Sequence, residues 1–159
     1  MKIRIICVGK LKEKYLLSGI NEYVKRLKNY CKVEIIELAD ESIPNNCSLA
    51  QEEIIKDKEG KRMMEKIKAD DYVIVLDVAS KQLDSIALAN KIETAMIAGK
   101  STIDFIIGGS LGHGKGILKR ADLCLSFSKL TFPHQLMRLI LVEQIYRSFK
   151  IIKNETYHK

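Results

Sequence analysis

Two hydrophobic periodicities alternate along the chain. Short apolar runs typical of strands occupy residues 2–8, 32–38, 72–76, 102–107 and 123–126. Apolar residues at three- and four-residue spacing predict helices over residues 12–29, 49–67, 84–98, 115–120 and 133–152. This alternation predicts an α/β fold, a mostly parallel sheet with helices on both faces. No linker or repeat interrupts the pattern, so we expect one domain over residues 1–159.

In a parallel α/β sheet, ligands bind beyond the carboxyl ends of the strands. Three predicted loops meet that description, and they follow Leu76, Ile107 and Ser126. The third loop, residues 127–132, combines two phenylalanines with hydroxyls and a lysine, then meets a helix that Pro133 opens. A plain connection would be shorter, with Gly or Asn at its turns. This composition makes the third loop a candidate binding element.

The glycine-rich loop after Ile107 resembles two nucleotide-binding motifs without matching either. Gly109 to Lys115 fit G-x-x-x-x-G-K, but Gly116 stands where a phosphate-binding loop needs Ser or Thr. The dinucleotide pattern G-x-G-x-x-G fails because Ile117 replaces its last glycine. A strand end with two glycines still lets a ligand approach the main chain closely. We interpret His113 as a loop residue, because nothing near it in the sequence would orient it.

Charge is distributed unevenly along the chain. The net charge of +7 is made of +7 over residues 1–32, −6 over residues 33–114 and +6 over residues 115–159. If the two terminal segments fold together, they form a basic face suited to a polyanion such as a nucleic acid. A solvated lysine surface is the alternative.

The four cysteines show no metal-ligand spacing, so we expect reduced thiols and no metal. With no apolar run of membrane-spanning length and no signal peptide, we expect a cytoplasmic protein.

Taken together, several motifs resemble the RlmH-type ribosomal RNA methyltransferases of the SPOUT class, over essentially the whole chain. The motifs that carry the resemblance are Gly9-Lys10-Leu11-Lys12, Phe105-Ile106-Ile107-Gly108-Gly109, the stretch Leu125 to Gln135, Glu143-Gln144-Ile145-Tyr146-Arg147, and Tyr157-His158-Lys159. The resemblance implies a trefoil knot in the C-terminal half and a homodimer. It also implies S-adenosylmethionine as methyl donor and, as target, N3 of a pseudouridine in the 23S RNA of the ribosome.

The resemblance also implies which residues form the site. The implied cofactor-binding residues are Leu76, Gly108, Phe127, Ser128, Lys129, Leu130, Thr131 and Phe132. The candidate catalytic residues are Arg147 as a stabiliser of the anionic base or a phosphate anchor, Tyr157 as a stacking partner and His158 as proton acceptor. We interpret His134 as structural or pocket-lining.

The closing helix and the polar tail complete the sequence expectations. The helix is apolar nearly all round from Leu136 to Val142, which suits a core helix or a dimer interface, and the resemblance favours the interface. We expect residues 157–159 to be disordered until RNA and cofactor bind. Two rival functions stay open on the residues alone: a P-loop-like nucleotide hydrolase and a non-enzymatic RNA-binding module.

Overall fold

A computed structural model describes residues 1–159. Five parallel strands form one sheet in the order β2-β1-β4-β3-β5. The strands are β1 (Lys2–Val8), β2 (Lys32–Leu38), β3 (Tyr72–Leu76), β4 (Thr102–Ile107) and β5 (Leu123–Leu125). The helices are α1 (Lys14–Leu27), α2 (Leu49–Met64), α3 (Ser85–Ile97), α4 (Lys115–Arg120) and α5 (His134–Ile152). The predicted α/β class is confirmed, and the sheet is parallel throughout.

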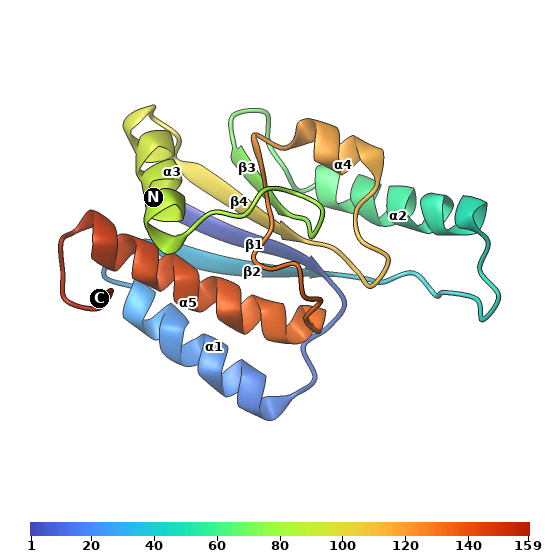
Figure 1. Ribbon diagram of the computed structural model, residues 1–159, viewed down its shortest axis with the longest axis horizontal. Helices are drawn as coiled ribbons and strands as arrows, with labels where there is room; N and C mark the ends of the chain where they lie inside the picture. The colour runs from blue at the N-terminus through green and yellow to red at the C-terminus, as the bar shows by residue number, and fades with distance from the viewer.

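Helices cover both faces of the sheet, as predicted (Figure 1). α1, α3 and α5 pack on one face, over a core that includes Ile5, Phe105 and Phe149. α2 and α4 pack on the other face, over a smaller core that includes Ile6, Val75 and Ile117. Because consecutive residues of a strand point to opposite faces, the central strands are apolar at nearly every position.

Most helix boundaries follow local signals in the sequence. Ser48 caps α2 by accepting a hydrogen bond from the Gln51 N–H, and Asp84 caps α3 by accepting one from Ala87. The predicted first helix begins two residues late, at Lys14. The reason is a tertiary contact: the Lys12 N–H donates to Gln135 Oε1 at 3.0 Å and is held outside the helix.

The connection from β5 to α5 crosses the connection from β3 to α3. The Asp77 N–H donates to the Leu125 carbonyl, and the Ser126 N–H donates to the Lys81 carbonyl, each at 3.0 Å. The chain then returns to the face that carries α1 and α3, where α5 packs between them (Figure 1). These contacts bring the loops after β3, β4 and β5 together at one edge of the sheet.

A buried arginine joins the start of α5 to the ends of β1 and β2. Arg138 is 1 % exposed. Its Nη2 donates to the carbonyls of Val8 at 2.9 Å and Gly9 at 2.7 Å, and its Nη1 donates to Glu37 Oε2 at 2.8 Å. Hydrogen bonds from a charged donor are stronger than neutral ones, so Arg138 holds the amino end of α5 against the sheet edge where the loops gather.

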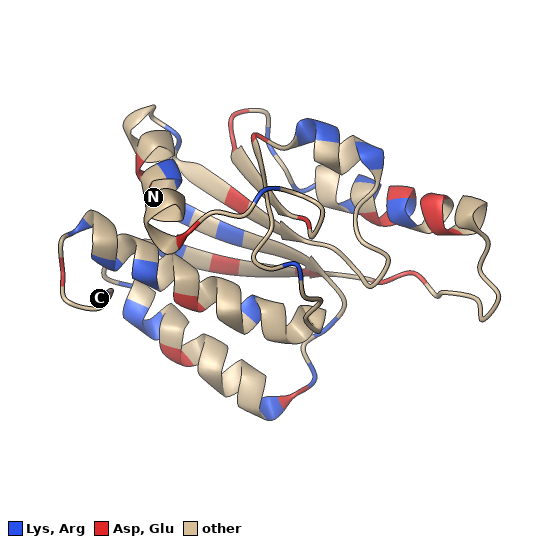
Figure 2. Cartoon of the chain, viewed as in Figure 1, with Lys and Arg blue, Asp and Glu red and all other residues tan.

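The two basic terminal segments pack together in the fold. α1 and α5 lie side by side, and lysines and arginines mark both helices (Figure 2). The expected meeting of the two segments is therefore partial, because α4, with Lys115, Lys119 and Arg120, lies on the opposite face of the sheet and Arg138 is buried. None of the helices combines the length and hydropathy needed to span a membrane, and no group of His, Cys, Asp and Glu side chains is arranged to hold a metal ion.

Candidate functional site

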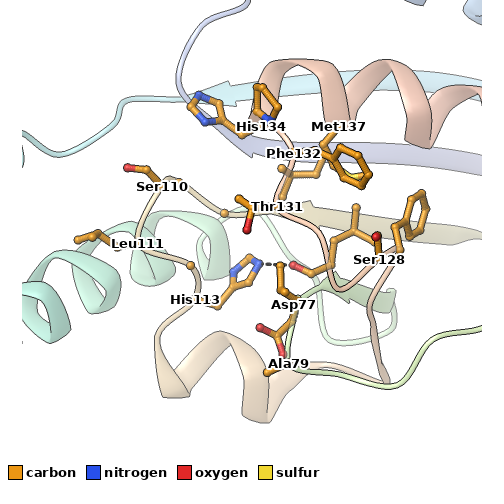
Figure 3. Close-up of a pocket in the computed structure, with 18 of the residues that line it drawn as sticks. Asp77, Ala79, Ser110, Leu111, His113, Ser128, Thr131, Phe132, His134 and Met137 are labelled. Atoms are coloured by element: carbon orange, nitrogen blue, oxygen red, sulfur yellow. Dashed lines mark hydrogen bonds between the residues drawn. The ribbon is translucent and has the colours of Figure 1, made fainter.

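A cavity of about 820 Å³ opens at the carboxyl ends of β3, β4 and β5. Its walls come from the three loops that the sequence singles out: residues 76–79, 107–113 and 125–134. Figure 3 shows Phe132, His134 and Met137 along one side and His113, Asp77 and Ala79 along the other. The cavity thus lies where ligands bind in parallel α/β sheets.

Seven of the eight residues that the resemblance assigns to the cofactor line this cavity. They are Leu76, Gly108, Phe127, Ser128, Leu130, Thr131 and Phe132. The eighth, Lys129, is exposed and does not line it. A lysine on the solvent side of the loop is better placed for a partner outside the cavity than for a ligand within it.

The 127–132 loop offers main-chain groups to a ligand. Among its six amide N–H groups, only that of Leu130 is used within the protein, as a donor to Ser128 Oγ at 3.0 Å. The Ser126 hydroxyl in turn donates to the Ser128 carbonyl at 3.0 Å and fixes the start of the loop. Free donors beside apolar side chains are what a planar heterocycle with polar edges requires.

His113 corrects one interpretation from the sequence. A neighbour does orient its ring: Nε2 lies 2.8 Å from the Leu76 carbonyl, which is 37 residues away in the sequence (Figure 3). The residue is only 9 % exposed, and its Nδ1 is buried without a partner. Burial lowers the pKa of His113 below its ordinary value, although the Leu76 carbonyl and Asp77 oppose the shift. His113 is therefore a neutral imidazole that donates to Leu76.

Two further groups lie at or beside the cavity: His134, which agrees with its interpretation from the sequence as pocket-lining, and Glu59, which lines the smaller neighbouring cavity and had no signal in the sequence. His134 lines both this cavity and a smaller one beside it, and burial together with Arg138 lowers its pKa. Glu59, on α2, is 6 % exposed and accepts a hydrogen bond from the Glu41 N–H at 3.1 Å. A Cβ atom at Gly109 would lie 2.8 Å from Glu59 Oε2, so this glycine is required by the carboxylate packed against it.

The three candidate catalytic residues form one cluster around Glu143. Arg147 donates from Nε and Nη2 to Glu143 Oε1 at 3.1 and 2.6 Å, and the Tyr157 hydroxyl donates to the same oxygen at 3.0 Å. His158 Nδ1 lies 3.3 Å from Arg147 Nη1. Burial, with Tyr23 and Glu143 nearby, raises the pKa of the Tyr157 hydroxyl, which stays protonated at neutral pH.

In one chain this cluster does not meet the candidate cofactor residues. Arg147, Tyr157 and His158 are absent from the lining of the 820 Å³ cavity. His158 instead lines a second cavity of about 530 Å³, between α3, α5 and the 127–132 loop. Phe127 and Phe132 line both cavities, so the loop is a wall shared between them.

The tail is folded back, in contrast to the disorder that we expected. The Tyr157 ring packs on Tyr146 with centroids 4.9 Å apart, and Glu155 accepts hydrogen bonds from Tyr30 and Lys150. An aromatic ring and an ion pair thus give the tail contacts that its polar composition does not reveal. Fraying is limited by these contacts with α1 and α5.

Comparison with known protein families places this arrangement of crossing loops in one family. The family model described as "Predicted SPOUT methyltransferase" matches residues 1–158. The chain therefore belongs to the SPOUT methyltransferase family, which has the knotted α/β fold that the sequence resemblance implied.

Curated relatives narrow the comparison within the family. The chain is 58% identical, over 100% of both chains, to "Ribosomal RNA large subunit methyltransferase H" of Alkaliphilus oremlandii. It is also 58% identical to the protein of that name from Finegoldia magna and 54% identical to the one from Enterococcus faecalis, again over the full length of both chains. The resemblance drawn from the motifs is confirmed.

Proposed function

We propose that this protein transfers a methyl group from S-adenosylmethionine to N3 of a pseudouridine in the 23S RNA of the ribosome, in the cytoplasm. The main support for this proposal is the identity of 54–58% to ribosomal RNA large subunit methyltransferases over the full length of both chains. The cavity at the crossing loops supports it, because its lining suits an adenosine. The basic α1 and α5 segments support a polyanionic substrate.

The residues of the cavity fit the proposed cofactor. Phe127, Leu130 and Phe132 provide apolar surface for an adenine ring, and the unused amides of the same loop provide donors for its edge. Gly108 lines the cavity at the end of β4, and its missing side chain makes room for the His113 ring. When bound, S-adenosylmethionine supplies an electrophilic methyl group on a sulfonium that leaves as a neutral thioether.

The acceptor base needs the chemistry of the Glu143 cluster. N3 of the base carries a proton near neutral pH, so that proton must be removed or the developing anion stabilised. His158 is our proposed proton acceptor, and Arg147 is placed to stabilise negative charge on the base or to hold a phosphate. Tyr157, whose hydroxyl is held by Glu143 and whose ring lies edge-on to Tyr146, is suited to stack on the base. Holding N3 of the base in line with the methyl group supplies most of the remaining rate acceleration.

A homodimer reconciles the two separate halves of the site. The cofactor cavity and the second cavity, which His158 lines, share the 127–132 loop as a wall, and we propose that a second copy brings its own Glu143 cluster to the cofactor cavity. Leu136 and Ile140, one turn apart on α5, are only partly buried in one chain, and Ile140 and Ile86 line the apolar second cavity. An apolar face of this kind, continuous with the tail, is suited to a second copy.

We expect Ile140→Asp to dissociate the dimer. A carboxylate on this apolar face would lose its hydration on association, which costs several kcal/mol, roughly a 100-fold or larger loss of dimer affinity. Light scattering at micromolar concentration should give a dimer for the native chain and a monomer for the variant. Ile97→Asp is the matched control, because Ile97 is 81 % exposed at the end of α3. A native chain that is monomeric would refute the shared site.

The proposed reaction has a direct test. The protein, labelled S-adenosylmethionine and ribosomes that lack the modification should give labelled 23S RNA, with N3-methylpseudouridine found after nuclease digestion. Separated large subunits and naked 23S RNA serve as parallel substrates and identify the form that is recognised. Label on another base, or no transfer to any of the three substrates, would contradict the proposal.

A further inference from the structure

His113 connects two strand ends that the proposed function assigns to the cofactor. Its Nε2 lies 2.8 Å from the Leu76 carbonyl at the end of β3. Its ring also lies against Gly108 at the end of β4, since a Cβ atom there would lie 2.9 Å from His113 Cε1 and 3.1 Å from Nδ1. The imidazole thus lies between the end of β3 and the end of β4, and it fixes the spacing of Leu76 and Gly108, which both line the cavity.

The hydrogen bond to Leu76 requires a proton on Nε2, which the neutral Nε2–H tautomer and the charged ring both carry, so the surroundings of Nδ1 decide whether the ring can take a second proton. Neutral His113 with its proton on Nε2 donates to the carbonyl and leaves Nδ1 as an acceptor. Nδ1 is buried and has no protein partner. A second proton at Nδ1 would place an N–H and a positive charge at a buried position where no protein group accepts a hydrogen bond, which is unfavourable. The ring can become charged only by leaving its place.

The charged groups around His113 do not provide that missing partner. Asp77, just after β3, is the carboxylate whose negative charge favours the protonated ring and raises the pKa of His113. From α2, Glu59 packs on Gly109 and Asp57 packs on Gly114, on either side of His113 in the chain. Glu59 accepts from the Glu41 N–H, and its pKa is raised chiefly by burial. None of the three carboxylates is hydrogen-bonded to the ring.

The loop that carries His113 can open. Gly112, just before it, has φ +86 and has open space where a Cβ would stand. Gly112 pairs with Gly109 through one backbone hydrogen bond of 3.1 Å, from the Gly112 N–H to the Gly109 carbonyl. Once the imidazole is released, residues 109–113 keep this hydrogen bond and the packing of Glu59 on Gly109, while Ser110 and Gly112 are exposed and can move into solvent.

We propose that His113 is a positioning residue for the cofactor, which in its neutral form fastens Leu76 to Gly108 and, when protonated, releases the loop and weakens cofactor binding. The proposal rests on the proposed use of S-adenosylmethionine. The sign follows from linkage: a histidine whose pKa is lowered in the closed state stabilises that state above its ordinary pKa of about 6.5. This stabilisation is lost as the pH falls from the ordinary pKa of histidine through the lowered pKa that His113 has in the closed state. Cofactor affinity then falls with the fraction of closed protein.

Calorimetric titration of S-adenosylmethionine at several pH values tests this. Between about pH 8 and about pH 5.5 the native protein should lose about tenfold in affinity. His113→Gln keeps an N–H that can reach the Leu76 carbonyl and has no titratable group, so its affinity should be the same at both pH values. His113→Leu removes the donor, and its affinity should be about tenfold weaker at either pH. Parallel pH profiles for the native protein and His113→Gln would overturn the proposal.

Hydrogen exchange separates this proposal from the proposed function. Amide protection of residues 108–113, measured without cofactor, should fall at acid pH in the native chain and stay constant in His113→Gln. If no protein binds S-adenosylmethionine at any pH, the proposed function fails, and the exchange result alone decides whether His113 fastens the loop. Equal protection in both proteins would overturn that role.

Discussion

Gly108→Val is expected to weaken S-adenosylmethionine binding by at least about 100-fold while the chain stays folded. A Cβ atom at this position would lie 2.9 Å from His113 Cε1 and 3.1 Å from the Gly112 carbonyl oxygen. The valine therefore displaces the imidazole from the Leu76 carbonyl and disturbs the cavity wall that Gly108 and His113 share. Calorimetry measures the affinity, and circular dichroism checks the fold.

Gly116→Ala is the matched control for this change. Gly116 lies in α4, and a Cβ atom there would meet nothing within 4 Å. Alanine favours a helix over glycine, so this variant should be as stable as the native chain or slightly more so, with native cofactor affinity. A folded Gly108→Val protein that binds the cofactor like the control would remove Gly108 from the site.

Deleting residues 157–159 should lower methyl transfer by at least about 100-fold with little change in cofactor affinity. The deleted residues include two members of the Glu143 cluster, and none of them lines the cofactor cavity. Loss of the Tyr157 contact with Tyr146 should reduce stability modestly. Transfer is measured on ribosomes, and removal of Lys159 alone is the control for shortening the chain.

Mixed dimers decide whether the cluster acts on the partner's cavity. A tail-deleted chain has an intact cofactor cavity, and a Gly108→Val chain has an intact tail. If the site is shared between subunits, co-expression of the two inactive chains restores one working site in each mixed dimer. If the site lies within one chain, mixed dimers remain as inactive as the two parents.

Local patterns predicted the secondary structure well. The bounds of β1, β2, β3, β4 and α4 agree with the sequence prediction, because each is a short apolar or capped segment whose neighbours break the pattern. The late start of α1 could not be predicted, since Gln135 holds Lys12 from 123 residues away. The knot came from the family resemblance alone, since periodicity carries no information about how a chain is threaded.

The candidate site was predicted in outline and missed in detail. The three strand-end loops were identified from the parallel topology, and they do line one cavity. His113 is a loop residue, as predicted, but the contact that orients its ring was missed because its partner, the Leu76 carbonyl, is a main-chain atom that any sequence would provide. The folded tail was also missed, since Glu155 is held by Tyr30 across 125 residues. Contacts of this separation are visible only once the fold is known.

The hydrogen bonds of Arg138 determine when this part of the fold can form during synthesis of the chain. Its carbonyl partners, Val8 and Gly9, lie 130 and 129 residues earlier in the chain, so they are made long before it. Contacts between such distant segments form late, because a long loop must close before they are gained. The sheet edge that bears the cavity therefore stays open until nearly the whole polypeptide has been synthesised. A nascent chain stalled before α5 would present β1 with these two carbonyls unbonded and would have no complete cavity.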